Sequence, residues 1–332
     1  MKLVVQIPCR DEEETLPRTL ADLPRRVEGF EAVDWVLVDD GSTDRSGEVA
    51  RACGVHEVVA LAGRQGLSSA FLAGLDAALR RGADVIVSTD ADNQYRGEDV
   101  ARLVQPILEG RADMVVGERP IGGMGFSPAK RLLQRLGSAV ARRVSGTDVP
   151  DTTSGFRAYT RGAALQINVF SGFSYTLETL VQLGLRRARI VSVPVRVNPV
   201  TRPSRLFRSI PEFVLKQGLT LLRVYSIYRP FELFAWPGAV LVLLGLLPAF
   251  RFLALFALGR GQGHVQSLIF ASILISVGTL LLLVAILASL IAANRVVLED
   301  LRVRVRQLEL REGRGDGAQP PAGVVEENTR PQ

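Results

Sequence analysis

Five short apolar runs alternate with helical stretches along the first 120 residues. The runs cover residues 3–9 (LVVQIPC), 35–41 (WVLVDDG), 56–61 (HEVVAL), 84–92 (DVIVSTDAD) and 113–119 (DMVVGER). A helical stretch such as 66–82 (GLSSAFLAGLDAALRRG) separates them. Runs that are apolar at successive positions are typical of parallel strands covered by helices on both faces. The pattern therefore predicts an α/β fold with a Rossmann-like, mostly parallel sheet.

Charged side chains gather where the predicted strands end. They are Asp11 and Glu12 after the first run, Asp39 and Asp40 in the second, Asp90 and Asp92 in the fourth, and Arg119 in the fifth. Because the carboxyl ends of parallel strands meet at one edge of a sheet, ligands bind there. The sequence contains neither a GxGxxG turn after the first run nor a GxxxxGK[ST] loop, so it lacks the dinucleotide and P-loop fingerprints.

Asp90 and Asp92 stand one small residue apart at the end of an apolar run. Carboxylates so placed suit Mg²⁺ or Mn²⁺, which commonly take one or two carboxylates together with a substrate's phosphates. A lone Asp-x-Asp is more often a solvated turn. The second acidic strand end, at Asp39 and Asp40, favours a ligand site, because the two ends would repel each other unless they faced a cation or bound a base and sugar.

Two long apolar segments follow the α/β region. Residues 231–250 carry one formal charge, Glu232, and residues 265–293 carry none. Each segment is long enough to cross the roughly 30 Å hydrocarbon core of a bilayer as a helix. We predict two transmembrane helices, at about 231–258 and 265–293, that form a hairpin. The alternative is a buried hairpin in a soluble protein, which so long an uncharged stretch disfavours.

Positive charge is distributed unevenly around these segments. Residues 202–229 carry six cations and residues 294–332 carry seven arginines, whereas the short turn carries only Arg260. The positive-inside rule therefore predicts an integral membrane protein whose soluble domain and two termini are cytoplasmic.

Four regions follow from these patterns. They are an α/β domain (1–208), an amphipathic region (209–230), the two spans (231–293) and a basic cytoplasmic tail with a disordered end (294–332). The amphipathic region lies in the membrane interface or packs on the soluble domain, and the sequence favours neither. In the tail, apolar residues recur at spacings of 3, 4 and 3: Leu298, Leu301, Val305 and Leu308. This heptad-like stripe pairs with a neighbouring chain, in a homo-oligomer, or lies on lipid.

Composition adds a bias toward phosphate ligands. The 332 residues include 40 Lys and Arg against 34 Asp and Glu, a net charge of +6. Only three cations are lysines, and the guanidinium of arginine binds phosphate oxygens in pairs. A GC-rich genome would give the same excess of arginine over lysine. The arginines follow the membrane flanks and strand ends rather than an aromatic face, so nucleic acid is not an expected partner.

Six short motifs occur in a fixed order along the chain. They are residues 7–12 (IPCRDE), 38–44 (VDDGSTD), 66–68 (GLS), 90–94 (DADNQ), 117–119 (GER) and 154–159 (SGFRAY). The series resembles that of family-2 glycosyltransferases with the GT-A fold, over residues 3 to about 230. The resemblance is closest to the polyprenyl-phosphate branch, with its dolichyl-phosphate mannose synthases and undecaprenyl-phosphate glucosyltransferases.

The resemblance implies a donor site, a metal site and an acceptor site. The implied donor-binding residues are Pro8, Arg10, Glu12, Asp39, Asp40, Asp90, Ala91, Arg202 and Arg205. The implied ligands of the divalent metal are Asp90, Asp92 and Gln94. The acceptor side comprises Arg119, Arg131, Arg157 and Glu178, and the catalytic residues are Asp92, Arg119 and Arg131. A structural salt bridge explains Arg157 or Glu178 equally well.

Three departures from the family pattern bear on donor identity. Asp11 stands where the family has Asn, Gln134 stands where a serine is expected, and the closing loop at 201–206 is short, with Arg205 where a lysine is common. The implied reaction is an inverting, metal-dependent transfer of a hexose from a nucleotide sugar of the GDP-mannose or UDP-glucose type. The acceptor is dolichyl or undecaprenyl phosphate at the cytoplasmic face of the membrane, that of the cell membrane in a prokaryote.

Two other functions stay open. The first is a membrane-anchored glycosyltransferase that acts on a lipid or glycan hydroxyl; processive enzymes of that kind carry a QxxRW motif and more spans, which this sequence lacks. The second is a non-catalytic scaffold that binds nucleotide sugars, which the intact candidate site disfavours. A phosphate acceptor needs no strong base, because its second pKa is about 6. Consistent with this, His56 and His264 lie beside no motif.

Overall fold

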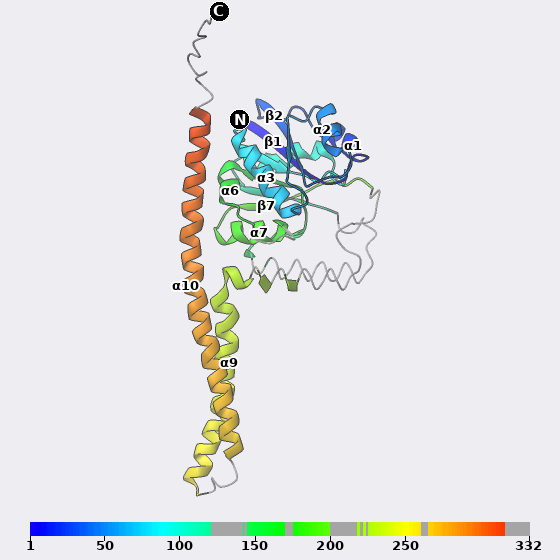
Figure 1. The fold of residues 1–332 in the computed structure, drawn as a ribbon. Coiled ribbons are helices and arrows are strands. Elements are labelled where there is room, and N and C mark those ends of the chain that lie inside the picture. Colours follow the sequence, from blue (N-terminus) through cyan, green and yellow to red (C-terminus); the bar gives the residue numbers. More distant parts are fainter. Residues whose placement is uncertain are drawn as a thin grey trace, which may run out of the picture.

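The computed structural model describes residues 1–120, 142, 145–169, 175–199, 218, 219, 222, 223, 225–259 and 265–315. They form an α/β unit followed by two long helices (Figure 1). The predicted site residues Arg131, Arg202 and Arg205 lie outside the described residues, as does most of the amphipathic region at 209–230.

A mixed sheet forms the centre of the α/β unit (Figure 1). Its strands are β1 (Lys2–Cys9), β2 (Ala32–Asp39), β3 (Glu57–Ala60), β4 (Val85–Ser88), β5 (Met114–Glu118), β6 (Arg157–Thr160) and β7 (Ile190–Pro194). They lie in the order β3-β2-β1-β4-β6-β5-β7, and only β6 runs antiparallel to its neighbours within this sheet. The predicted α/β fold with a mostly parallel sheet is confirmed, and the five apolar runs form β1 to β5.

Helices cover both faces of the sheet. One face carries α1 (Leu16–Asp22), α2 (Ser46–Ala52), the 3₁₀ helix η1 (Gly97–Asp99) and α4 (Val100–Leu108); the other carries α3 (Leu67–Arg80), α6 (Arg161–Gln166) and α7 (Tyr175–Leu185). The two cores are separate clusters, with Leu16 and Leu103 in the first and Phe71 and Leu180 in the second. Burial on both faces explains why β1 and β4 are apolar at nearly every position.

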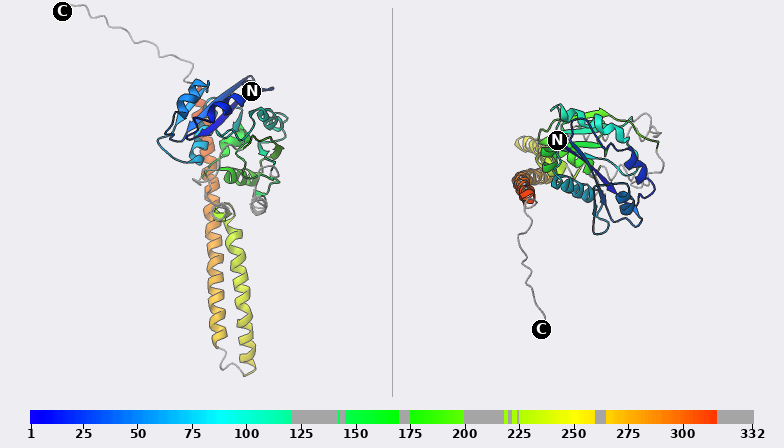
Figure 2. Two further views of the ribbon diagram at one scale, coloured as in Figure 1. Left: turned by 90° about the vertical axis from the view of Figure 1, so that its right-hand side faces the viewer. Right: turned by 90° about the horizontal axis from the view of Figure 1, so that it is seen from above.

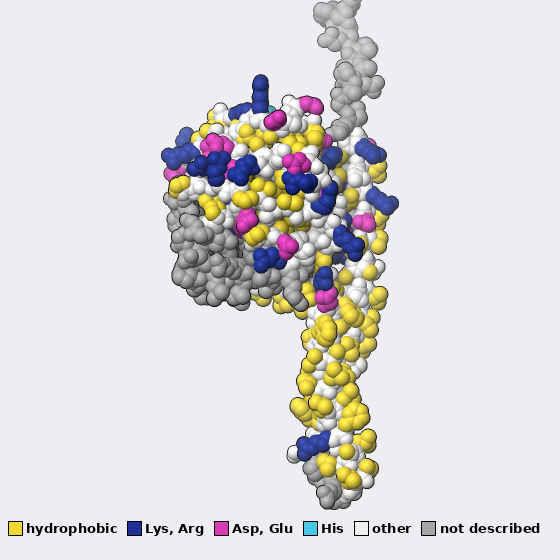
Figure 3. Space-filling view, turned by 180° about the vertical axis from the view of Figure 1, so that it is seen from behind, with side chains coloured by type: hydrophobic (Ala, Val, Ile, Leu, Met, Phe, Trp, Pro, Cys, Tyr) yellow, Lys and Arg dark blue, Asp and Glu magenta, His cyan; other side chains and the backbone are white. Residues whose placement is uncertain are grey.

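The chain then forms two helices that pack side by side (Figure 1). They are α9 (Pro230–Ala257) and α10 (Val265–Gly315), and both are long and apolar enough to cross a membrane by length and composition. Gly238 and Gly278 allow the two backbones to approach closely, since a Cβ atom on Gly238 would lie 2.9 Å from the Gly278 carbonyl oxygen. Hydrophobic side chains cover most of the visible surface of this hairpin away from the α/β unit (Figure 3).

Helix α10 continues beyond Ala293, where the sequence predicts the end of the second span. Its second half runs along the side of the α/β unit (Figure 2), so the first part of the predicted tail is an ordered helix that docks on the soluble domain. Val303 and Leu310 pack against the core cluster of α3 and α6. The predicted disorder concerns residues that lie outside the described part of the chain.

The end of the amphipathic region also contacts the soluble domain. Tyr225 and Tyr228 pack against Leu177 and Val181 of α7. The Tyr228 ring also lies 4.8 Å from the Arg295 guanidinium of α10. This part of the region therefore joins α7 to α10. Of the two placements that its pattern allows, this is packing on the soluble domain.

Candidate active site

The Asp-x-Asp motif forms a turn directly after β4, and α1 holds it in place. The carbonyl oxygen of Ala91 accepts hydrogen bonds from the hydroxyls of Thr15 (3.1 Å) and Thr19 (2.9 Å). Asp92 Oδ1 accepts from the backbone amide of Gln94 at 3.1 Å. These contacts fix the backbone of the turn and leave Asp90 and Asp92 half-buried at the edge of the sheet.

The surroundings of Asp90 disfavour the ionised form of its carboxyl group. Burial and the neighbouring Asp92 raise the pKa of Asp90 to about 7, against the opposing effect of Arg119. A divalent cation would relieve this repulsion, and the carboxylates of Asp90 and Asp92 with the amide of Gln94 are hard oxygen donors of the kind it prefers. Among the described residues no group of three or more His, Cys, Asp or Glu side chains could hold a metal. A divalent cation at such carboxylates commonly takes further ligands from a substrate's phosphates.

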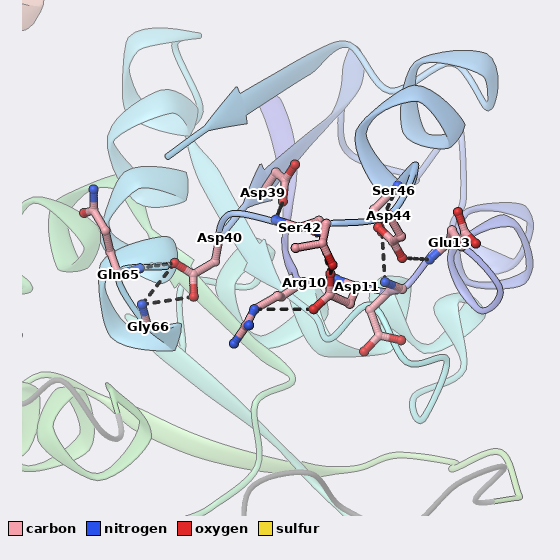
Figure 4. Close-up of polar contacts among 12 residues, drawn as sticks. Arg10, Asp11, Glu13, Asp39, Asp40, Ser42, Asp44, Ser46, Gln65 and Gly66 are labelled. Atoms are coloured by element: carbon pink, nitrogen blue, oxygen red, sulfur yellow. Dashed lines mark hydrogen bonds and ion pairs between the residues drawn. The ribbon is translucent and has the colours of Figure 1, made fainter. Parts of the chain in front are cut away.

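The loops after β1 and β2 are interlocked by side-chain hydrogen bonds (Figure 4). Asp11 has a positive φ of 51°, a conformation that Asp and Asn adopt more readily than most residues. Its carboxylate accepts from the amide of Thr43 at 2.7 Å, and that bond lowers the pKa of Asp11. The Asp11 amide donates to the Ser42 hydroxyl at 3.0 Å. The departure from the family's Asn is thus accommodated by the backbone.

Asp39 and Asp40 both shape loops at this edge (Figure 4). Asp39 Oδ1 accepts a hydrogen bond from the backbone amide of Ser42 at 2.8 Å. The Asp40 carboxylate accepts from the backbone amides of Gln65 (2.6 Å) and Gly66 (2.9 Å). The buried Asp40 carboxylate therefore holds the loop that precedes α3.

The other predicted donor residues that the structure describes, Pro8, Arg10 and Glu12, lie at the same edge. Pro8 is buried near the end of β1, and Arg10 Nε lies 3.5 Å from Asp11 Oδ2 (Figure 4). Glu12 is mostly buried and accepts from the Thr15 hydroxyl at 2.7 Å. Thr15 also bonds to Ala91, so these contacts bring the first motif and the Asp-x-Asp turn together.

Arg119 lies at the end of β5 and forms a two-pronged ion pair with Asp151. Its Nε donates to Asp151 Oδ2 at 2.6 Å, and its Nη2 donates to Asp151 Oδ1 and to the Thr153 hydroxyl, both at 2.9 Å. The Asp151 side chain is 1% exposed. Although burial opposes ionisation, the guanidinium holds the pKa of Asp151 below its ordinary value. The arginine is therefore charged and oriented before any ligand arrives.

Arg157 lies beneath the site rather than on its surface. The fully buried guanidinium donates to the carbonyls of Thr152, Ser154 and Thr176 and to the Thr179 hydroxyl. An acceptor contact of the kind that the resemblance implies for Arg157 would require these bonds to break. The structure thus places this residue as a support for the 152–154 loop.

Glu178 lies in the first turn of α7 and is 1% exposed. Its contact with an acceptor stays a prediction.

Three residues that the sequence analysis did not assign also build the site. Asp151 orients Arg119, and the buried Tyr95 hydroxyl accepts from the Gly155 amide at 3.1 Å. Gly155 allows a close approach, because a Cβ atom there would lie 2.9 Å from Asp90 Oδ2. The signals were an acid three residues before the SGFRAY motif and a tyrosine directly after DADNQ.

Paired carboxylates beside an oriented arginine, at the carboxyl edge of a mostly parallel sheet, can hold a cation and phosphate groups together. This fold and this site define a GT-A glycosyltransferase. The model of the family "Glycosyl transferase family 2" matches residues 4–167, and the chain belongs to this family.

Relatives with named activities share much of their length with this chain. The undecaprenyl-phosphate mannosyltransferase of Micrococcus luteus is 31% identical over 207 residues, which cover 59% of this chain and 83% of the relative. The polyprenol monophosphomannose synthase of Mycolicibacterium smegmatis is 30% identical over 206 residues, covering 58% and 76%.

A solved structure supports the fold. Glucosyl-3-phosphoglycerate synthase from Mycobacterium tuberculosis, in complex with Mn²⁺, UDP and phosphoglyceric acid, superposes with a TM-score of 0.52 at 21% sequence identity. The match covers 66% of this chain and 78% of that one.

Proposed function

We propose that this chain transfers a hexose from a nucleotide sugar to a polyprenyl phosphate in one inverting step. The names of the two curated relatives support the lipid phosphate as acceptor. The observation that carries the proposal is the juxtaposition of Asp90 and Asp92 with Arg119, whose guanidinium Asp151 orients. Such a site can bind two phosphate-bearing substrates at once, because it offers both a cation site and a fixed positive charge.

The donor would lie across the edge of the sheet. Pro8, Arg10, Glu12, Asp39 and Asp40 surround the loops where its base and ribose would bind. Asp90, Asp92 and Gln94 would hold Mg²⁺ or Mn²⁺, which when bound stabilises the departing diphosphate. Arg202 and Arg205, from the closing loop, complete the proposed donor set.

The acceptor phosphate would bind at Arg119, with Arg131 as its second proposed partner. A lipid monophosphate is largely ionised near neutral pH, so its oxygen attacks the anomeric carbon without a general base. The described histidine fits this chemistry, since His56 precedes β3 at the far edge of the sheet and accepts a hydrogen bond from the Trp35 amide. The role left to the chain is to screen two anions from each other and to orient them.

The membrane would deliver the lipid to this site. Helices α9 and α10 would span the bilayer with the catalytic unit and both termini in the cytoplasm, as the arginine-rich flanks indicate. The lipid phosphate then lies at the same membrane face as the α/β unit.

A donor screen tests the proposal. The full chain in membranes is incubated with a short-chain polyprenyl phosphate or the matching polyprenol, and with GDP-mannose, UDP-glucose or another nucleotide sugar, with and without EDTA. We expect one donor to yield a glycolipid and EDTA to prevent it. Absence of transfer from every donor would favour the non-catalytic scaffold, and transfer to polyprenol alone would favour the hydroxyl acceptor.

A further inference from the structure

Beyond the membrane span, α10 carries apolar side chains that the α/β unit does not cover. Leu298, Leu301, Val305 and Leu308 are 65%, 52%, 52% and 56% exposed. We refer to these four residues as the exposed stripe. They recur at spacings of 3, 4 and 3, which is the repeat of a coiled-coil seam.

The other side of this helical segment is already occupied. Val303 and Leu310 pack against the core of the α/β unit, and Glu299 and Arg306 form ion pairs with it. At 3.6 residues per turn, these four positions lie nearly opposite the exposed stripe. In Figures 1 and 2 α10 stands at the edge of the α/β unit, which lies against one side of the helix only.

Lipid does not explain the exposed stripe. At a rise of 1.5 Å per residue, Leu308 lies roughly 22 Å along the helix beyond Ala293, where the apolar stretch ends. Helix α10 continues alongside the α/β unit instead of bending toward the plane of a membrane (Figure 1). Four large, exposed apolar side chains on one helical face favour a protein partner.

We propose that the exposed stripe binds the same stripe of a second copy of this chain in a short parallel coiled coil. The proposal goes beyond the transfer reaction and rests only on the membrane anchoring described under the proposed function. Two copies inserted in one membrane with the same orientation must present their α10 helices in parallel. Because each α/β unit lies on the side away from the stripe, the pairing leaves both units room (Figure 1).

Charges beside the stripe fit this arrangement. In a parallel coiled coil with seam positions a and d, the residue just before position a is called g. It lies close to an e residue of the partner helix, five positions further along the sequence. Arg304 and Glu309 have this spacing, both are exposed, and they flank Val305 and Leu308 on opposite sides of the seam. A symmetric pair would therefore form two Arg304–Glu309 contacts between copies, and contacts of this kind select partner and orientation.

A coiled coil of two heptads is marginal for free peptides in water. Here the helix is already formed and docked on the α/β unit through Val303 and Leu310, so pairing does not have to order it. Anchoring both copies in one membrane also raises their effective concentration. Both factors favour a dimer of the full chain in the membrane.

Disulfide cross-linking tests the proposed seam. Leu301→Cys is introduced into the full chain in membranes, in a Cys53→Ser background that retains only the buried Cys9. A disulfide requires Cα atoms about 4.4 to 6.8 Å apart, which facing seam positions provide. The matched control is Gln307→Cys, which is exposed and lies between Val305 and Leu308 in the sequence but off the stripe. We expect mild oxidation to give a covalent dimer with Leu301→Cys and at least ten-fold less with Gln307→Cys.

Charge reversal then identifies the partner as a second copy. In the Leu301→Cys chain, Arg304→Glu should lower dimer formation roughly ten-fold, because two attractive contacts become repulsive. Adding Glu309→Arg should restore it, since the swapped charges again match. The proposal is overturned if Leu301→Cys stays monomeric, as it would with lipid or another protein on the stripe. Equal cross-linking of Gln307→Cys, or absence of rescue by the charge swap, would overturn it as well.

Discussion

At the residue scale, Asp92 tests the proposed cation site. Asp92→Asn keeps the shape of the side chain and can still accept a hydrogen bond from the backbone amide of Gln94, so the turn should fold. Because a neutral amide binds a divalent cation poorly, we expect transfer to fall at least roughly 100-fold. The measurement is glycolipid formation at saturating donor, with circular dichroism as the control for folding. Full activity of Asp92→Asn in excess EDTA would contradict the assignment.

Asp151 is the second residue for which the structure predicts the effect of a substitution, here on the folding free energy. Asp151→Asn removes one partner of a buried ion pair and leaves Arg119 uncompensated, so we expect a loss of about 3 to 5 kcal/mol of folding free energy. The native pKa of Asp151 lies below its ordinary value, so its contribution is present above the unfolded pKa and is lost as the pH falls through the native pKa. The difference between variant and wild type should therefore shrink in acid.

The control for Asp151 is a solvent-exposed pair of the same geometry. Asp113 also accepts a two-pronged contact from an arginine, Arg189, but that arginine is 58% exposed. Asp113→Asn should change the denaturation midpoint little, because exposed ion pairs contribute little to stability. Equal midpoint shifts for Asp151→Asn and Asp113→Asn in urea would show that the Arg119 pair has no special role.

At the scale of elements, the segment just before β6, which contains Gly155, packs against the turn after β4. Gly155→Ala would place a methyl group 2.9 to 3.0 Å from both carboxylate oxygens of Asp90, which forces the carboxylate or the loop to shift. We expect transfer to drop at least ten-fold while the fold persists. Gly162→Ala is the control, since its Cβ atom meets nothing closer than 4.0 Å. A Gly155→Ala enzyme with normal activity would show that the position of Asp90 is not critical.

The elements that the sequence predicted best are the strands that are buried at successive positions. The strands β1 to β5 are apolar because helices cover both faces, so their pattern is visible without knowledge of the fold. Because β2 and β4 both run parallel to β1, the acidic residues that follow these strands lie at one edge of the sheet.

The elements that sequence reasoning missed depend on contacts between distant segments. Strand β6 begins with Arg157, a residue typical of surfaces, and its burial is possible because the carbonyls of Thr152, Ser154 and Thr176 and the Thr179 hydroxyl accept its hydrogen bonds. The pairing of Arg119 with Asp151 joins residues 32 apart, and no local pattern reveals it. The docking of α10 likewise needs the surfaces of α3 and α6, which lie far away in the sequence.

At the scale of the whole molecule, the proposed topology is tested by labelling. A cysteine at Gly261, which lies between α9 and α10 in the sequence, should react with a membrane-impermeant maleimide only from the side opposite the cytoplasm. Gln307→Cys is the control and should react only from the cytoplasmic side, because the second half of α10 lies beside the α/β unit. Reaction of the Gly261 cysteine from the cytoplasmic side alone would contradict the predicted spans.

The central claim is that a lipid phosphate attacks the donor directly at this site. One in-line displacement inverts the anomeric carbon, because no covalent sugar intermediate forms. The most direct measurement is NMR of the product formed from an α-linked nucleotide sugar and a short polyprenyl phosphate, with the matching polyprenol as a parallel acceptor. We predict a β-linked sugar phosphate and no product from the alcohol. An α-linked product, or equal transfer to the polyprenol, would contradict the account.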